Sequence, residues 1–309
     1  MANKLEMVIL DWAGTTIDYG CFAPTVAFVE ACRQMGFDLS TAEARIPMGL
    51  KKDEHIREFL GLGERYKEHP LISGKNGVVE RWTEQFGKAP QKDDAEGIFS
   101  LFISAQIKCL PKYTDLIPGT LETVEYCRKL GLKIGSTTGY MGNDAPTYNM
   151  MTILLKEAEK LGYVPDVSVC ATGHVAERGW ERGKWNQRWK ESKVNLPQAR
   201  PAPWMCLENA KRMNIYPFYK CVKVDDTVDG ISEGVNAGMW TIGLIKTSSD
   251  MGLTEAEVNA LPKQELEKRL KLNYDKMKEA GANYIVDGIW NVPEKIEEIQ
   301  RLVKYGGRP

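Results

Sequence analysis

The chain has 309 residues, 43% of them hydrophobic, which is enough to bury a full core as one large domain or as two smaller ones. Its formal net charge of −1 gives no overall electrostatic reason to expect nucleic acid or an anionic membrane as a partner. The expected partner is therefore a small-molecule substrate.

The beginning of the chain, MANKLEMVIL, contains a hydrophobic stretch that is too short for a secretion signal and that meets an acidic residue at once. No other apolar run approaches the length of a transmembrane helix. The seven cysteines are odd in number and include no C-x-x-C pair, which argues against a disulfide framework and against a zinc site. Together these features predict a cytoplasmic protein with reduced thiols.

Three short apolar runs are each followed by polar, loop-forming residues, and each is typical of a buried parallel strand that ends in a loop. They lie within residues 7–16, 132–140 and 221–230. Patterns with helical period lie between and after them, at residues 118–131, 147–162 and 203–214. This alternation predicts an α/β fold with a doubly wound parallel sheet.

Polar side chains follow all three predicted strands. Because ligands of such sheets bind beyond the carboxyl ends of the strands, we expect these side chains to meet in one crevice. The residues concerned are Asp11, Thr137, Thr138, Asp225 and Asp226.

Residues 21–110 differ from the rest, because their patterns are helical throughout and no strand lies between them. Ser40 and Glu43 have the spacing of a capping box, and Gly61 and Gly87 stand where helices are expected to end. We therefore expect residues 1–20 and 111–309 to form the α/β core domain. Residues 21–110 are expected to form an all-helical cap inserted after the first strand.

Residues 174–195 combine three tryptophans with six basic and three acidic side chains. Basic and aromatic residues in alternation can bind nucleic acid or a membrane surface. In a chain with almost no net charge, a lid over the site or a contact between subunits is the favoured interpretation. Its role stays open at this point.

The chemistry begins at Asp11, a single carboxylate at the end of the first predicted strand. A Gly-Thr pair follows it closely, and the backbone N–H groups of such a turn can hold an anion, so Asp11 is placed for attack on phosphorus. Here the sequence resembles the haloacid dehalogenase superfamily, whose first motif is D-x-D-G-T. The other elements follow in the same order along the chain: Thr138, a basic residue in QARPAPW (Arg200), and the acidic VDDTVD.

Ala13 stands where phosphatases of that superfamily carry the aspartate that protonates an alkoxide leaving group. An enzyme without this acid expels an alkoxide poorly, so the leaving group is expected to be carbon. Cleavage of a C–P bond leaves a carbanion, which needs an electron sink such as a lysine Schiff base. The segment PMGLKKDEHI offers Lys51, Lys52 and His55 at the start of a helix, whose N-terminus lowers a lysine pKa. His55 lies on the same helix face as Lys52.

These features narrow the resemblance to one family. The segments DWAGTTIDYGCFAP, ARIPMGLKKDEHI, KIGSTTGY, RPAPWMC, EGVNAGMWTIG and GLTEAEV are similar to the phosphonoacetaldehyde hydrolase family. The resemblance extends over nearly the whole chain and is weakest in residues 62–105, 172–196 and 275–309. It implies hydrolysis of phosphonoacetaldehyde to acetaldehyde and phosphate, a requirement for Mg²⁺, and a homodimer.

The resemblance also implies the roles of individual residues. Lys52 would form the imine, His55 would move protons, and Asp11 would attack phosphorus. Asp11, the backbone carbonyl of Ala13 and Asp226 would hold Mg²⁺, an ion that prefers such oxygen ligands. The substrate would contact the remaining residues: Thr138 and Arg200 at the phosphoryl group, and Cys21, Met48 and Tyr140, together with His55, at the aldehyde end.

The acidic loop departs from the family pattern G-D-T-x-x-D. In the same register, Asp225 replaces the glycine and Gly230 replaces the final aspartate. Either Asp225 or Asp229 would then supply the missing acid, or the metal would be held more loosely. Two alternative functions stay open. One is a related hydrolase that acts on a different, substituted phosphonoaldehyde, and the other is a non-catalytic binding protein on the same fold.

Overall fold

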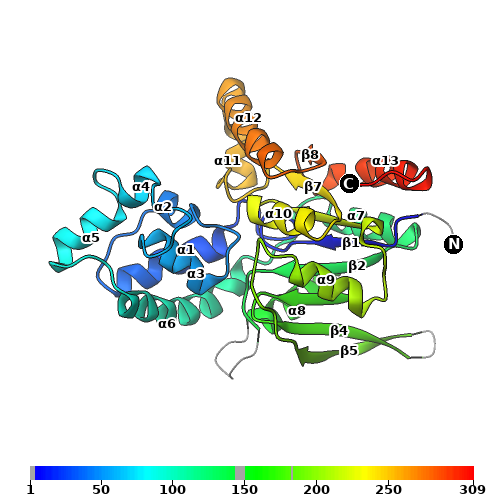
Figure 1. Cartoon of the computed structure of the whole chain (residues 1–309), viewed down its shortest axis with the longest axis horizontal. Helices are drawn as coiled ribbons and strands as arrows, with labels where there is room; N and C mark the ends of the chain where they lie inside the picture. Colours follow the sequence, from blue (N-terminus) through cyan, green and yellow to red (C-terminus); the bar gives the residue numbers. More distant parts are fainter. Residues whose placement is uncertain (1–3, 143–149, 182–183) are drawn as a thin grey trace.

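A mostly parallel β-sheet forms the centre of the protein in the computed structural model, which describes residues 4–142, 150–181 and 184–309 (Figure 1). Within those residues the sheet has eight strands in the order β5-β4-β3-β2-β1-β6-β7-β8. The strands are β1 (Met7–Leu10), β2 (Lys133–Thr138), β3 (Val167–Cys170), β4 (His174–Glu181), β5 (Lys184–Lys193), β6 (Cys221–Asp225), β7 (Trp240–Leu244) and β8 (Tyr284–Val286).

The three strands expected from the sequence are neighbours at the middle of this sheet. Strand β1 pairs in parallel with β2 on one side and with β6 on the other. All four residues of β1, Met-Val-Ile-Leu, are buried, as expected for a strand covered on both faces. The strand order reverses at β1, and such a reversal opens a crevice at the carboxyl ends of the strands. The sequence therefore predicted correctly where the polar side chains would meet.

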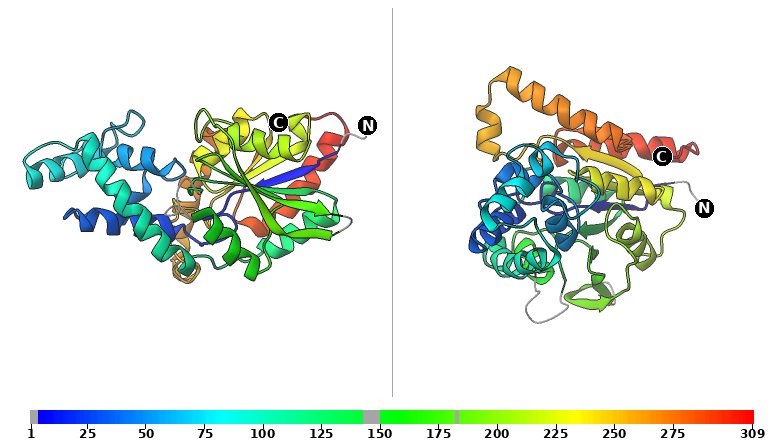
Figure 2. Two further views of the ribbon diagram at one scale, coloured as in Figure 1. Left: turned by 90° about the horizontal axis from the view of Figure 1, so that it is seen from below. Right: turned by 60° about the vertical axis from the view of Figure 1, so that its left-hand side comes forward.

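Helices cover both faces of the sheet, as the predicted doubly wound fold requires (Figure 2). Buried residues of α7, α8 and α13 belong to one hydrophobic cluster, and those of α9 belong to a second cluster on the other face. The helices are α7 (Thr120–Lys129), α8 (Met150–Lys160), α9 (Trp204–Arg212), α10 (Val228–Asn236), α11 (Glu255–Ala260), α12 (Lys263–Glu279) and α13 (Val292–Lys304), and the short 3-10 turns are η1 (Leu110–Lys112), η2 (Phe218–Lys220) and η3 (Ile289–Asn291).

The segment between β1 and η1 is helical and lies beside the carboxyl ends of the strands (Figure 1). Ser40 and Glu43 form the predicted capping box, and Gly87 ends its helix in the left-handed conformation. We call residues 21–110 the cap segment and the remainder the core, a division that stays a prediction. The helices of the cap segment are α1 (Phe22–Gln34), α2 (Thr41–Arg45), α3 (Lys52–Phe59), α4 (Pro70–Ser73), α5 (Val78–Phe86) and α6 (Lys92–Cys109).

The tryptophan-rich segment forms a β-hairpin. Strand β4 pairs antiparallel with the edge strand β3, and β5 pairs antiparallel with β4. Strand β4 runs away from the cap segment and β5 returns toward it, so that the hairpin lies along the edge of the sheet (Figure 1). The expectation of a lid was wrong, because the segment extends the sheet instead of covering its carboxyl edge. A contact between subunits stays a prediction.

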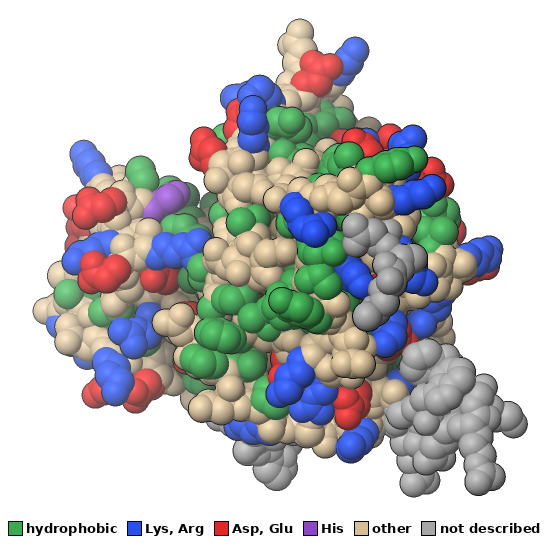
Figure 3. Space-filling view, turned by 45° about the vertical axis from the view of Figure 1, so that its right-hand side comes forward, with side chains coloured by type: hydrophobic (Ala, Val, Ile, Leu, Met, Phe, Trp, Pro, Cys, Tyr) green, Lys and Arg blue, Asp and Glu red, His purple; other side chains and the backbone are tan. Residues whose placement is uncertain are grey.

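Figure 3 shows one face of the molecule, on which basic and acidic side chains are scattered among hydrophobic groups. This distribution agrees with the net charge of −1. In the described part of the chain, no helix is both long enough and apolar enough to cross a membrane.

Candidate active site

Asp11 follows β1 directly and is held at the carboxyl edge of the sheet by backbone and side-chain bonds. Its backbone N–H donates to the carbonyl of Val224, and the Thr16 hydroxyl donates to its carbonyl oxygen at 2.9 Å. The turn that follows requires glycine at position 14, where φ is +83° and a Cβ atom would collide with the carboxyl group of Asp226. This turn therefore brings the carboxylates of Asp11 and Asp226 close together.

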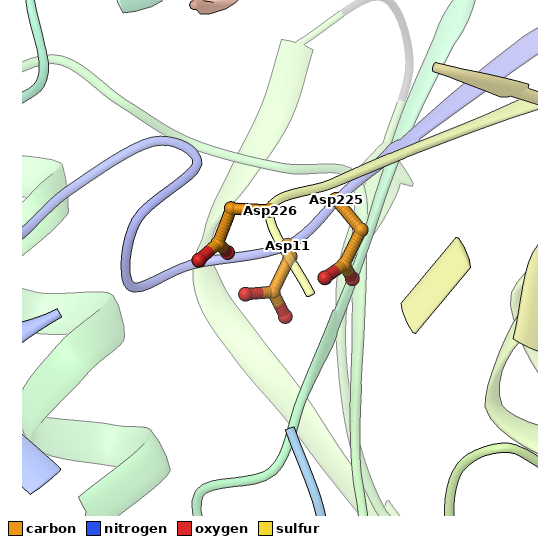
Figure 4. Close-up of side chains that lie close together, drawn as sticks. All are labelled: Asp11, Asp225 and Asp226. Carbon is orange, nitrogen blue, oxygen red and sulfur yellow. The ribbon is translucent and has the colours of Figure 1, made fainter. Parts of the chain in front are cut away.

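Three carboxylates gather at the ends of β1 and β6. One oxygen from each of Asp11, Asp225 and Asp226 lies within 4.8 Å of the others, and Asp11 stands between the other two (Figure 4). Burial, opposed in part by Arg200, raises the pKa of Asp11 to about 6. Burial and the nearby charges of Asp225 and Asp11 raise the pKa of Asp226 well above its ordinary value. This crowding of negative charge favours binding of a cation.

Asp226 is fixed by two further bonds that leave it facing this cluster. The Thr15 hydroxyl donates to one of its oxygens at 3.2 Å, and the backbone N–H of Ser249 donates to the other at 3.0 Å. Asp226 is fully buried. An oxygen-only donor set of this kind suits a hard divalent cation such as Mg²⁺.

A buried network of charges lies next to the carboxylate cluster. The Arg200 guanidinium donates to Asp11 at 2.5 Å and to Glu233 at 2.9 Å, and it also contacts Asp225 at 3.3 Å. The Lys223 ammonium contacts Asp225 at 2.8 Å. When Asp11 and Asp226 are both ionised, four carboxylates face two cations, and one divalent cation would balance the two remaining negative charges. The residues present therefore fit a metal ion.

The structure distinguishes between Asp225 and Asp229, the two candidates for the missing acid of the loop. Asp225 belongs to the carboxylate cluster, whereas the carboxylate of Asp229 pairs with Arg65 of the cap segment. A Cβ atom at Gly230 would overlap the carboxyl group of Asp225. The Asp225 carboxylate therefore fills the space that a side chain at position 230 would need. Although burial opposes it, the charges of Arg200 and Lys223 hold the pKa of Asp225 below its ordinary value.

Lys52 reaches this site from the cap segment, where it is the first residue of α3. A Cβ atom placed on Gly139, just after β2, would lie 3.8 Å from its amine nitrogen. The amine also lies 5.5 Å from the ring centre of Tyr140 and 5.7 Å from that of Phe28. Burial among these groups lowers the pKa of Lys52 to about 8. Burial is the main cause, whereas the sequence suggested the helix N-terminus.

His55 lies one turn further along α3 and is fully buried. Its Nε2 is 2.8 Å from the carbonyl oxygen of Ala44, and its ring stacks on Phe28 with the centres 4.0 Å apart. Because a carbonyl can only accept, Nε2 carries the proton and Nδ1 is the free acceptor, without a hydrogen-bond partner among the described residues. Burial and the nearby Lys52 lower the pKa of His55 well below its ordinary value, so the ring is neutral at pH 7.

A cavity of about 30 Å³ lies between the cap segment and the core. Five of the six residues expected around the substrate line it, but His55, the sixth, is not in its wall, so the expected position of this residue was wrong. Its volume has room for about two water molecules, which is too little for a substrate with a phosphoryl group and a carbon chain. The lining residues are Asp11, Ala13, Cys21, Pro24, Met48, Gly49, Lys52, Thr138, Gly139, Tyr140, Arg200 and Thr227.

Sequence reasoning missed two members of the charge network, Lys223 and Glu233. Lys223 lies inside a buried strand and Glu233 inside α10, and both side chains are fully buried. The lysine did carry a signal, because a charge in the middle of an apolar strand needs a partner in the core. The glutamate carried none, since glutamate is common in helices.

No protein-family model matches the chain. It is 41% identical to the phosphonoacetaldehyde hydrolase of Syntrophobacter fumaroxidans over 307 residues, which cover 99% of this chain and 96% of the relative. It is 36% identical to a phosphonoacetaldehyde hydrolase-like protein of the same organism, with the same two coverages. The crystal structure of a phosphonoacetaldehyde hydrolase-like protein from Oleispira antarctica matches with a TM-score of 0.82 and 32% identity, covering 100% of this chain and 97% of that one.

Proposed function

The chain belongs to the phosphonoacetaldehyde hydrolase family of the haloacid dehalogenase superfamily, and from this premise we propose that it hydrolyses the C–P bond of phosphonoacetaldehyde to acetaldehyde and phosphate. One observation carries the proposal. A buried amine, Lys52, and a buried carboxylate, Asp11, line the same small cavity. Ala13 lines it too, at the position where an acid for an alkoxide leaving group would stand.

In this proposal the reaction starts at Lys52. Its uncharged amine attacks the aldehyde carbon, water leaves, and the resulting imine takes up one proton from the surroundings, so that a protonated imine joins the enzyme and the substrate. The lowered pKa of Lys52 makes the uncharged amine accessible near pH 7. The rings of Phe28 and Tyr140 keep the amine in apolar surroundings.

Asp11 then attacks phosphorus, forming a P–O bond as the C–P bond breaks. The electron pair of the broken bond moves into the imine, which becomes a neutral enamine, so that no free carbanion forms. Arg200 and Thr138 would hold the phosphoryl oxygens, and Arg200 already contacts Asp11. Protonation of the enamine carbon and hydrolysis of the imine release acetaldehyde. Water then cleaves the aspartyl phosphate and releases phosphate.

Asp11, Asp225 and Asp226 would hold Mg²⁺, and the backbone carbonyl of Ala13 is a further ligand expected from the resemblance. When bound, the ion supplies positive charge to the phosphoryl oxygens. The chain's own residues orient the groups around it: Thr15 and the backbone of Ser249 hold Asp226 in place.

His55 would exchange protons with Lys52, one turn away on α3, from behind the cavity wall. Its Nδ1 acceptor is free and its ring is neutral, which a proton acceptor near Lys52 requires. Cys21 and Met48 would contact the carbon chain of the substrate, since both line the cavity. The homodimer and the cytoplasmic location expected from the sequence stay predictions.

One alternative has support, namely a related hydrolase for a substituted phosphonoaldehyde. The chain is similar both to a phosphonoacetaldehyde hydrolase and to hydrolase-like proteins. A non-catalytic binding protein has less support, because it has no use for a buried amine and a buried carboxylate in one cavity.

The test of the proposal is release of both acetaldehyde and phosphate from phosphonoacetaldehyde in the presence of Mg²⁺. We expect equal amounts of the two products and loss of turnover when the metal is chelated. Faster turnover of an aldehyde substituted next to the phosphonate would favour the alternative. Inertness toward both aldehydes would contradict the proposal.

The pKa of Lys52 makes imine formation pH-dependent. With a pKa of about 8, about one amine in ten is uncharged at pH 7, against fewer than about one in a thousand for an exposed lysine. Trapping of the aldehyde by cyanoborohydride should rise about tenfold from pH 6 to pH 7 and level off above about pH 8. Lys51→Arg is the matched control, because Lys51 pairs with Asp53 outside the cavity wall and its loss should leave trapping unchanged. A rate that still climbs steeply above pH 9 would contradict the lowered pKa.

A further inference from the structure

The cavity between the cap segment and the core raises the question of how a substrate enters. At about 30 Å³ it is too small for one, so entry of a substrate requires the walls of the cavity, which come from both parts, to move apart. A larger cavity of about 430 Å³ lies at the same junction, and Met48 and Thr227 line both. The two cavities are therefore neighbours at the junction of the cap segment and the core.

One ion pair crosses this junction among the described residues, between Arg65 of the cap segment and Asp229 of the core. The Asp229 side chain is 1% exposed, whereas that of Arg65 is 36% exposed. Apart from Arg65, the Asp229 carboxylate has no hydrogen-bond partner within the described chain, so Arg65 supplies its charge compensation. A buried carboxylate that depends on one cation strongly favours the arrangement in which that cation is present.

On the cap side, Arg65 is connected to the helix that carries Lys52. Glu58, near the end of α3, accepts a hydrogen bond from the backbone N–H of Tyr66 at 2.9 Å and a longer one from that of Arg65 at 3.4 Å. The loop with Arg65 is therefore fixed to the same helix whose first residue is Lys52.

On the core side, Asp229 lies in the first turn of α10, directly after the acidic loop. Thr227 caps this helix and also donates to Asp225 at 2.7 Å. Gly49 of the cap segment packs closely here, since a Cβ atom on it would lie 3.0 Å from the Thr227 hydroxyl and 3.2 Å from the Asp229 Cβ. The ion pair thus spans from α3 to the loop that carries the carboxylate cluster.

We propose that Arg65 and Asp229 are positioning residues, whose ion pair holds the Lys52 helix over the carboxylate cluster when the cap closes and must break when it opens. The proposal rests on the proposed function, because it concerns the two halves of that site. Neither residue lines the small cavity, so the pair acts through the helix and the loop and does not touch the substrate.

The kinetic test compares Arg65→Ala, Asp229→Asn and the double variant. Removing either partner favours the open form, so KM should rise roughly tenfold while kcat changes little, because saturating substrate restores closure. The KM of the double variant should be no higher than the higher of the two single-variant values, because both substitutions remove the same contact. Arg57→Ala is the matched control: Arg57 is an exposed arginine on α3 that should leave KM unchanged. An unchanged KM in Arg65→Ala, or fully additive single effects, would overturn the proposal.

A second measurement needs no turnover and so separates this inference from the proposed function. The radius of gyration of the substrate-free protein in X-ray scattering should increase in Arg65→Ala and Asp229→Asn relative to the unchanged chain and Arg57→Ala. Thermal unfolding shows whether Asp229→Asn stays folded. Equal radii in all folded variants would overturn the positioning role, even if the unchanged chain hydrolyses its substrate.

Discussion

Asp11→Asn is expected to abolish phosphate release, by at least about a thousandfold, because the amide cannot attack phosphorus. The same change should stabilise the metal-free protein. The pKa of the Asp11 carboxyl is about 6 in the fold against an ordinary value of 3.8, so its charged form costs about 3 kcal/mol of unfolding free energy at pH 7. This cost is absent below about pH 4 and grows until the pH passes about 6. Activity and thermal unfolding, the latter with a chelator, check both effects.

Lys52→Arg tests the other half of the reaction, imine formation, and is compared with Asp11→Asn. It keeps the positive charge but removes the amine that forms the imine, so both turnover and reductive trapping should disappear. Asp11→Asn, in contrast, should still be trapped at Lys52, because imine formation precedes attack on phosphorus. Residual phosphate release in Asp11→Asn near the rate of the unchanged chain would contradict the role of Asp11. Loss of trapping in a folded Asp11→Asn variant would contradict the proposed order of steps.

The part of the site that could be predicted from the sequence lies at the ends of the central strands. Asp11 and Asp226 follow short apolar runs, and the parallel sheet brings such ends together whatever the details of packing. Lys52 could be predicted because its segment carries specific motif residues. The meeting of the strand ends needed only local patterns and one rule about sheet topology, whereas the choice of Lys52 also needed the resemblance to the family.

The rest depends on tertiary contacts that no local pattern contains. The hairpin was missed because charged residues alternate with tryptophan along it, and edge strands tolerate such charges. The pairing of Asp229 with Arg65 joins positions far apart in the chain. The sequence could not decide whether Asp225 or Asp229 joins the carboxylate cluster, because the two positions are close together in the chain. The answer depends on where each carboxylate lies between α10 and β6.

The resemblance expects an acid at position 230, and the geometry supports the hypothesis that Asp225 supplies this acid instead. The carboxylate of Asp225 occupies the volume that a side chain on Gly230 would fill, and Lys223 and Arg200 contact it there. An aspartate at position 230 would approach the same volume from the first turn of α10, where a negative charge is favourable. An aspartate at position 230 should therefore be able to replace Asp225, provided that position 225 becomes glycine at the same time.

Asp225→Gly alone should lower kcat/KM by at least about a hundredfold, because it removes one acid of the cluster and leaves Lys223 and Arg200 buried with fewer partners. Gly230→Asp alone should be similarly harmful, since two carboxyl groups would compete for one volume. The double variant Asp225→Gly/Gly230→Asp should recover to within about tenfold of the unchanged chain. Turnover as a function of Mg²⁺ concentration measures all three.

Asp229→Asn is the control for this series, because its carboxylate lies outside the cluster and its loss should not change the Mg²⁺ concentration that gives half-maximal turnover. Thermal unfolding of each variant separates misfolding from loss of the metal site. Recovery in the double variant would show that the cluster needs a carboxylate at this location in the fold, whether it comes from position 225 or from position 230. A double variant as inactive as either folded single variant would mean that Asp225 acts through its place at the end of β6, with a geometry that α10 cannot reproduce.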